Sequence, residues 1–192
     1  MLCCIVEAMP RSDIRTKMIE GAVRRLAVNG VEGTSFADVL AATGAPRGSI
    51  YHHFPGGKTE LLHAALDLAS ERALAAMEAT RGKPPAVVVA QFLDLWRELL
   101  NRSKLSAGCA VLAVTVAAGD DELFDHAGTI FQTWTDHLTE LFTAGGMRTP
   151  RARELAATVI AATEGAVAVS RALRSREPFD HVAVTLTRLA KM

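Results

Sequence analysis

Residues 34–58 read TSFADVLAATGAPRGSIYHHFPGGK, and they predict two short helices joined by a tight turn. Ser35 is placed to cap the first helix, because its hydroxyl can accept a hydrogen bond from the backbone N–H of Asp38. Gly44 can adopt the left-handed conformation that ends this helix, and Pro46 suits the start of the next one. The stretch therefore predicts a helix-turn-helix hairpin.

The second helix of the hairpin, about residues 47–53, has an apolar face and a polar face. Ile50 and Phe54 are spaced i, i+4, so both are expected to face the first helix. The outward side chains carry hydroxyl, imidazole and cationic groups, which suit the bases and phosphates of a DNA major groove. A solvated hairpin inside an ordinary helical domain is the alternative that the spacing leaves open. The residues interpreted as DNA-binding are Thr34, Ser35, Arg47, Gly48, Ser49, Tyr51, His52, His53 and Lys58.

Within this set, some residues are expected to contact bases and others to contact phosphates. Arg47 and Ser49 are predicted to read base edges, because the N-terminal residues of a recognition helix enter the groove. Gly48 lets the backbone approach the DNA closely. The N-terminus of the helix that begins at Ser35 would hold a phosphate. Further phosphate contacts are predicted from Thr34, Tyr51, His52 and Lys58.

The hairpin resembles the N-terminal domain of TetR-family transcriptional repressors. The family pattern appears here as Thr43-Gly44-Ala45 and Gly48-Ser49-Ile50-Tyr51-His52-His53-Phe54, with Thr34 before it and Lys58 after it. The version APRGSIYHHFPGGK, residues 45–58, is similar to the branch of the lincomycin-resistance operon repressor, although Pro46 stands where most of the family has serine or threonine. The resemblance implies a homodimer that binds a pseudo-palindromic operator, and a small hydrophobic effector that releases it.

The composition favours an all-α protein. Of the 192 residues 49% are hydrophobic and 5% aromatic, and alanine, the best helix former, is abundant. The 21 basic and 21 acidic side chains cancel, so DNA binding would depend on a local positive patch. The longest apolar run, residues 109–118, is shorter than the roughly 18 residues of a membrane span. We therefore expect a cytoplasmic protein with no membrane partner.

The three cysteines are Cys3, Cys4 and Cys109, and their spacing fits no zinc site. We expect no metal and no cofactor. Cys3 and Cys4 are interpreted as disordered or as preceding an alternative translation start at Met9. An enzyme that uses Cys109 as a nucleophile, helped by His126 or His137, is one alternative function, although no local motif joins these residues. A sensor module without DNA function is the other.

Apolar periodicity predicts further helices on both sides of the hairpin. One at about residues 12–28 would complete a three-helix DNA-binding domain, residues 1–57. A long helix from Lys58 to about Arg81 would connect it to a ligand-binding and dimerisation domain, residues 58–192. Later helices are expected at about residues 85–101, 109–118, 121–144, 151–174 and 179–189.

Two sets of residues in the larger domain suggest its functions. An apolar ligand pocket is predicted between the helices, although each residue could instead be plain core. Its residues are Phe92, Trp96, Cys109, Leu112, Phe131 and Trp134. The last two helices carry a narrow apolar stripe that suits a two-subunit four-helix bundle, with packing inside one domain as the alternative. Its residues are Leu155, Val159, Ala162, Ala166, Val169, Leu173, Val182, Leu186 and Leu189.

Overall fold

The computed structural model describes residues 11–117 and 121–192. The described residues form α-helices and no strands, which confirms the expected all-α class. Cys3, Cys4 and Met9 lie outside them. The helices are α1 (Arg11–Asn29), α2 (Phe36–Thr43), α3 (Ser49–His53), α4 (Gly57–Glu78), α5 (Pro85–Arg102), α6 (Ala110–Thr115), α7 (Asp121–Ala144), α8 (Thr149–Leu173) and α9 (Glu177–Leu189).

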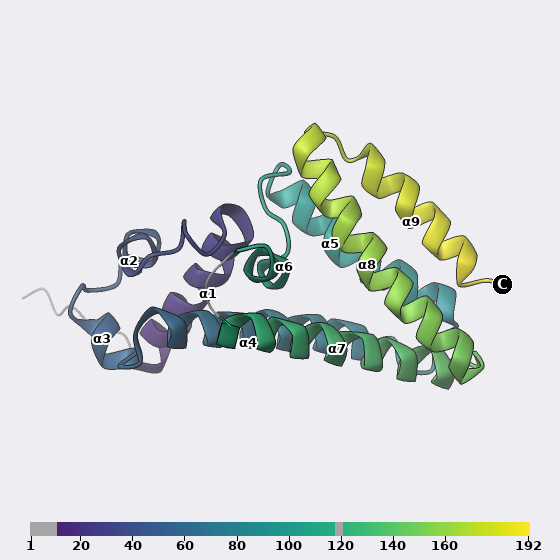
Figure 1. Cartoon of the computed structure of the whole chain (residues 1–192), viewed down its shortest axis with the longest axis horizontal. Coiled ribbons are helices and arrows are strands. Elements are labelled where there is room, and N and C mark those ends of the chain that lie inside the picture. The colour runs from purple at the N-terminus through teal and green to yellow at the C-terminus, as the bar shows by residue number, and fades with distance from the viewer. Residues whose placement is uncertain (1–10, 118–120) are drawn as a thin grey trace, which may run out of the picture.

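The molecule is elongated, with a small group of helices at one end and a larger group at the other (Figure 1). Helices α1, α2 and α3 form the small end, and α5, α8 and α9 lie at the far end. The long helix α4 packs on α1 at one end and runs beside α7, so it connects the two groups. Helix α6 packs against both α1 and α7 at the junction.

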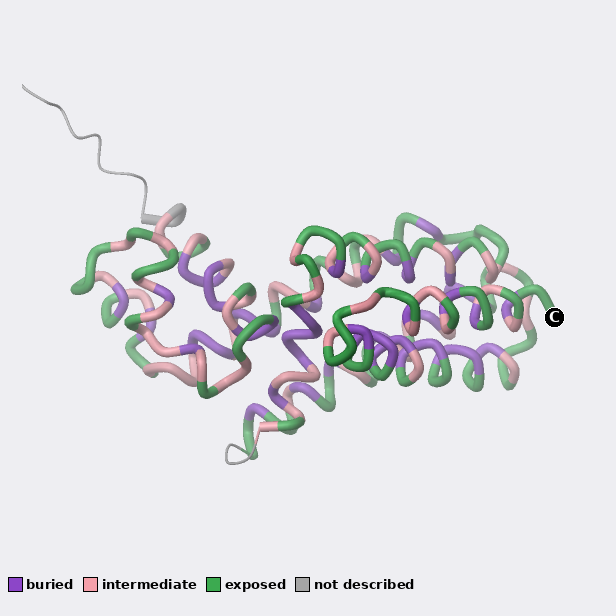
Figure 2. Tube along the Cα trace, turned by 90° about the horizontal axis from the view of Figure 1, so that it is seen from above, coloured by how far each residue is buried: buried purple, intermediate pink, exposed green. Residues whose placement is uncertain are grey.

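The core of the larger group follows the helical period. Along α7 the buried residues recur every three or four positions, which makes one face apolar. Figure 2 shows buried residues on the inner sides of the helices and exposed residues on the outer sides. Trp134 also makes a buried hydrogen bond between helices: its indole N–H donates to the Ser70 hydroxyl at 3.1 Å and so joins α7 to α4. Burial of each large apolar side chain stabilises the fold by roughly 1.5–3 kcal/mol.

Two helices differ from the sequence-based expectation. Helix α6 is shorter than predicted, and Val116, beyond its end, is 77% exposed. Its start is capped by Cys109, whose sulfur accepts from the N–H of Leu112 at 3.3 Å. Helix α3 begins at Ser49, because the backbone N–H of Ser49 closes a turn onto the carbonyl of Pro46 at 3.0 Å.

Helix α8 is the one described helix that is long and apolar enough, by composition alone, to cross a membrane. The mean hydropathy of its most apolar 18-residue window is 1.3, and half of that window is buried inside the protein. The core helix of a helical protein passes the same test, so this observation is weak evidence for a membrane span. The packing of α8 against α7 and α9 accounts for its apolar composition.

Candidate DNA-binding face and ligand cavity

The start of α2 is fixed by a capping box. The Ser35 hydroxyl oxygen accepts from the N–H of Asp38 at 3.2 Å, and the Asp38 carboxylate accepts from the N–H of Ser35 at 3.0 Å. The Ser35 side chain, then its backbone N–H, lowers the pKa of Asp38, and the Arg25 guanidinium 3.1 Å away acts in the same direction. Gly44 ends the helix with φ at 68°. The hairpin is therefore held by its own local contacts.

Helix α3 is anchored to the small end by its apolar face. Ile50 and Phe54 are fully buried together with Val39 of α2, which confirms their predicted inward orientation. The guanidinium of Arg15 in α1 lies over the Phe54 ring, 5.1 Å from its centre. This anchoring turns the opposite side of α3 toward solvent.

The outer side of α3 carries most of the predicted DNA-binding residues. Tyr51 is 70% exposed, and its ring rests edge-on against Phe36 at 5.6 Å. Arg47, Gly48 and His52 are also exposed, whereas Ser49 and His53 are half-buried. An exposed aromatic ring that packs on a neighbouring ring is already positioned for an external contact. The DNA contacts themselves stay a prediction.

Thr34 and Lys58 brace the loop before α2. Thr34 is only 1% exposed, and its hydroxyl donates to the Gly30 carbonyl at 2.7 Å. This burial removes the Thr34 side chain from the surface and corrects its interpretation as a phosphate contact. The Lys58 ammonium donates to the Val31 carbonyl at 2.9 Å. An ammonium has three N–H donors, so Lys58 can still hold a phosphate.

A cavity of about 360 Å³ lies between α1, α4, α5, α6 and α7. Its size suits a small molecule. Four of the six predicted ligand-binding residues line it, namely Phe92, Trp96, Cys109 and Trp134. Leu112 lines a neighbouring cavity of about 270 Å³, and Phe131 packs edge-on against Trp134 at 5.7 Å. The other lining residues of the larger cavity are Val23, Ala27, Ala69, Arg72, Ala73, Leu95, Leu99, Gly108, Ala110 and Val111.

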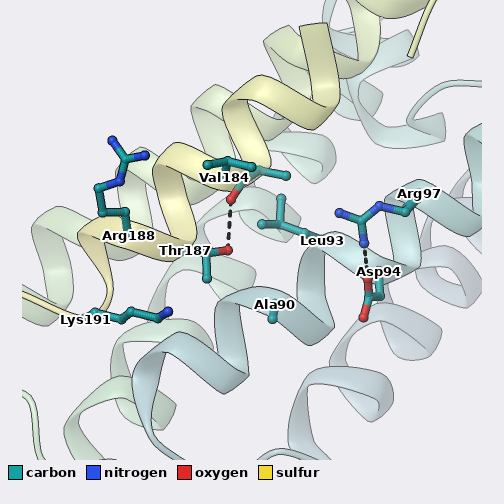
Figure 3. A pocket seen from close by; sticks show the side chains of 9 residues that line it. Ala90, Leu93, Asp94, Arg97, Val184, Thr187, Arg188 and Lys191 are labelled. Carbon is teal, nitrogen blue, oxygen red and sulfur yellow. Dashed lines mark hydrogen bonds and ion pairs between the residues drawn. The ribbon is translucent and has the colours of Figure 1, made fainter. Parts of the chain in front are cut away.

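A second hollow, of about 350 Å³, lies between α5 and α9 (Figure 3). Its lining carries several charged side chains, among them Arg188 and Lys191. Arg97 is held by Asp94 and by Asp180, the latter at 3.7 Å. This charged hollow contrasts with the cavity at Trp96 and Trp134, whose lining contains one charged side chain.

Glu164 and Cys109 form a buried polar pair beside the larger cavity. Burial raises the pKa of the Glu164 carboxyl to about 7, although the hydrogen bond from the Cys109 thiol acts against this. Glu164 is only 7% exposed, and among the residues that the structure describes neither its Oε2 nor the hydroxyl of Thr163 has a hydrogen-bond partner. The sequence analysis missed Glu164. The available signal was a single acidic residue within an otherwise apolar stretch of α8.

The surroundings of Cys109 do not suit a nucleophile. Burial, followed by the charge of Glu164, raises the pKa of the Cys109 thiol well above its usual value, so the reactive thiolate is disfavoured. The two histidines considered as helpers are engaged elsewhere: His126 lies 2.9 Å from Asp67, and His137 lies 3.1 Å from Glu78. Across residues 11–117 and 121–192, no group of three acidic, histidine or cysteine side chains could hold a metal ion.

The wall of the cavity is joined directly to α1. The backbone N–H of Gly108, the neighbour of Cys109, donates to the carbonyl of Ala27 at 2.7 Å. Arg171 of α8 donates to the carbonyls of Ser106 at 2.9 Å and Val28 at 3.4 Å. A Cβ atom on Gly108 would lie 2.6 Å from Arg171 Nη1, so a larger residue there would push the Arg171 side chain away from its place. We call these contacts the α1 junction.

The predicted dimerisation stripe is divided between the core and the surface. Half-buried members are Ala162, Val182 and Leu189, while Val169 and Leu173 are exposed. The remaining members are buried within the protomer, which corrects their assignment to the surface: Leu155, Val159, Ala166 and Leu186. The outer face of α8 instead carries a row of small exposed residues, Ala157, Ala161, Gly165, Ala168 and Ala172, which we call the outer α8 face.

Comparisons with known proteins agree over most of the chain. The family described as bacterial regulatory proteins, tetR family, matches residues 18–65, and the C-terminal domain of LmrA/YxaF-like transcriptional regulators matches residues 85–185. The uncharacterised regulator Rv0196 of Mycobacterium tuberculosis is 35% identical over 88% of this chain and 89% of that protein. The regulator LmrA of Bacillus subtilis is 27% identical over 95% of this chain and all of that protein.

A solved structure supports the same assignment. The crystal structure of a TetR transcriptional regulator from Chloroflexus aurantiacus is 27% identical, with a TM-score of 0.75 over 93% of this chain and 94% of that chain. The hairpin and the helical body thus define a helix-turn-helix transcriptional regulator. The chain belongs to the TetR family, as the resemblance of its hairpin predicted. Proteins of this family are DNA-binding regulators and not enzymes.

Proposed function

We propose that the protein is a repressor that binds a pseudo-palindromic operator as a homodimer and leaves it when a small hydrophobic molecule enters the cavity. The observation that carries this proposal is the hydrogen bond from Gly108, in the cavity wall, to Ala27 in the last turns of α1. It gives a bound molecule a direct physical route to the DNA-binding helices. As a DNA-binding regulator, the protein would act in the cytoplasm.

On DNA, the outer side of α3 would lie in the major groove. Arg47 and Ser49, at the N-terminal side of α3, would reach base edges. Tyr51, His52 and Lys58 would hold phosphate oxygens and fix the register of the helix. Tyr51 supports this role because its exposed hydroxyl sits on a ring already positioned by Phe36.

The homodimer would form through the outer α8 face. Its small side chains allow two helices to approach closely, and a two-fold axis makes the same face serve both subunits. The two copies of α3 would then reach successive major grooves, about 34 Å apart. Operator affinity would therefore depend on the spacing between the two small ends.

The ligand would act by changing this spacing. A molecule that displaces the segment at Gly108 and Cys109 would disturb the α1 junction, and α1 packs on both α2 and α4. If the ligand prefers the arrangement in which the two copies of α3 no longer match the grooves, it shifts the population toward that arrangement. The loss of DNA affinity equals its differential affinity for the two states.

The direct test is fluorescence anisotropy with DNA from immediately upstream of the gene. Saturable binding of two subunits per site that resists a random duplex competitor would support the repressor. The measurement at two salt concentrations separates the phosphate contribution from sequence recognition. Binding no tighter than to random DNA, for this fragment and for sites selected from a random duplex library, would contradict the proposal and favour a sensor without DNA function.

Base reading and phosphate holding can be separated by substitution. Arg47→Ala is expected to weaken operator binding and to relax base preference, with a loss of about 1–3 kcal/mol on the operator, because it removes a base contact. Tyr51→Phe is expected to weaken operator and random DNA alike, since phosphates carry no sequence. Fluorescence anisotropy on the operator and on the random duplex gives, for each, the ratio of the variant's dissociation constant to that of the wild type. Equal losses on both duplexes for Arg47→Ala would exclude Arg47 as a base reader.

The α1 junction is expected to favour the DNA-binding arrangement in the absence of ligand. Arg171→Met removes both hydrogen bonds to Ser106 and Val28 while keeping an unbranched side chain. We expect operator affinity to fall about tenfold, within the usual range of coupling between sites. The loss of affinity should be accompanied by faster hydrogen exchange of the backbone amide of Gly108. The control is Arg153→Met, at an exposed position of α8 far from α1, which should leave both quantities unchanged.

A further inference from the structure

Glu164 is a buried acidic side chain, and within residues 11–117 and 121–192 no cation compensates it. Its carboxyl is 7% exposed, and the two influences on its ionisation are burial and the thiol of Cys109. Its Oε2 atom has no hydrogen-bond partner in the described part of the chain. A buried carboxylate costs several kcal/mol unless a cation or several hydrogen bonds compensate it. The structure gives this carboxyl one hydrogen-bond donor, the Cys109 thiol, so its charged form can accept a further donor from outside the chain.

The position of Glu164 connects it to the ligand cavity. It contacts Cys109, and the Cys109 side chain lines both the cavity of about 360 Å³ and the neighbouring one of about 270 Å³. Val167, one turn further along α8, lines the smaller of the two. Glu164 lines neither cavity itself, but it contacts Cys109 in the wall that the two cavities share, so a bound molecule that displaces the Cys109 side chain would meet it.

The rest of the cavity limits the kind of molecule that fits. Aromatic rings of Phe92, Trp96 and Trp134 offer apolar contact and also attract cations through their faces. The charged side chain in the lining, Arg72 of α4, is already paired with Glu20 of α1. An anionic ligand would thus compete with Glu20 for Arg72 and would meet no second charged side chain in the lining.

Resting on the ligand-responsive function above, we propose that the molecule bound in this cavity is a hydrophobic amine whose ammonium group donates to the Glu164 carboxylate. The apolar part of the amine lies against the aromatic wall. Its charge supplies the cation that Glu164 lacks. Charge-assisted hydrogen bonds of this type are roughly twice as strong as neutral ones.

The pairing also makes binding depend on pH. Glu164 must be ionised to pair with an ammonium group, and its pKa of about 7 leaves it partly protonated at neutral pH. The titratable group that faces it is the thiol of Cys109 on α6, whose raised pKa keeps it neutral in this range. Binding of the amine therefore releases a proton, and its affinity should rise about tenfold between pH 6 and pH 8.

Three probes of one shape test the proposal in the absence of DNA: 1-adamantylmethylamine, the corresponding alcohol and the corresponding carboxylate. Their binding is measured by calorimetry at pH 6 and pH 8. A change in tryptophan fluorescence shows that the probe binds in this cavity, because both tryptophans of the chain, Trp96 and Trp134, line it. We expect the amine to bind at least about tenfold more tightly than the alcohol at pH 8, and the carboxylate to bind most weakly.

Glu164→Gln should remove both the preference for the amine and its pH dependence while the alcohol still binds. Glu154→Gln, at an exposed position of the same helix, should change neither. Equal affinities for amine and alcohol, tighter binding of the carboxylate, or no binding of the amine would each overturn the proposal. The binding test contains no DNA, so it gives the same answer whether or not the ligand releases the operator. Likewise, a failure of the amine to bind would not contradict specific operator binding.

Discussion

Replacing Gly165 with arginine is expected to split the homodimer and to lower operator affinity by about 100-fold or more. Gly165 is exposed on α8, and a Cβ atom there would meet nothing within 4 Å, so a single protomer tolerates the change. At a two-fold interface of small residues, two guanidinium groups would be forced together and desolvated. The loss of the second subunit removes the high effective concentration of its hairpin at the adjacent half-site. Sedimentation gives the mass, and anisotropy gives the affinity.

The matched control is Gly128→Arg. Gly128 is also an exposed glycine within a long helix, α7, and a Cβ atom there also meets nothing within 4 Å. Both variants carry the same helix propensity change and the same added charge, so general effects cancel. A Gly165→Arg protein that remains dimeric and binds the operator normally would exclude the outer α8 face as the interface.

The hairpin was predictable because its determinants are local. Ser35, Asp38 and Gly44 act within four residues of the backbone groups that they satisfy, and the i, i+4 pair of Ile50 and Phe54 fixes which side is buried. The phosphate contact predicted for Thr34 was wrong because the position of this side chain does not depend on a helical spacing. Its burial follows from the turn at Gly30, which brings a carbonyl to its hydroxyl, and no spacing rule predicts that contact.

At the larger end the helices could be predicted from the sequence, but the side of α8 that packs on the core could not. Helix α8 is apolar on several sides, so periodicity alone does not say which side meets the core. The structure buries the small Ala166 and exposes the larger Leu173, so side-chain size does not decide which side is inside either. Glu164 was missed because its burial depends on the loop before α6, which brings Cys109 against it from a distant part of the sequence.

The stability of the wild-type protein is expected to fall by about 2–3 kcal/mol between pH 5 and pH 8 through Glu164 alone. The pKa of this carboxyl is about 7 in the folded protein against an ordinary value of 4.5. Between these values the folded state holds a proton that the unfolded state has lost. Stability from this group is therefore fully present below about pH 4.5 and is lost as the pH rises through about 7. Urea denaturation at several pH values gives the free energy of unfolding.

Other groups also titrate in this range, so the quantity to measure is the difference between the wild type and Glu164→Gln. An amide has nearly the same shape as the carboxylic acid but no charge, and its free energy of unfolding should lack this decline. The variant should consequently be the more stable protein at pH 8 and close to the wild type at pH 5. Glu154→Gln should follow the wild type at every pH, since Glu154 is an exposed residue of the same helix. Parallel curves for the wild type and Glu164→Gln would show that the Glu164 carboxylate is compensated in the folded protein, and would remove the reason for seeking its partner in the ligand.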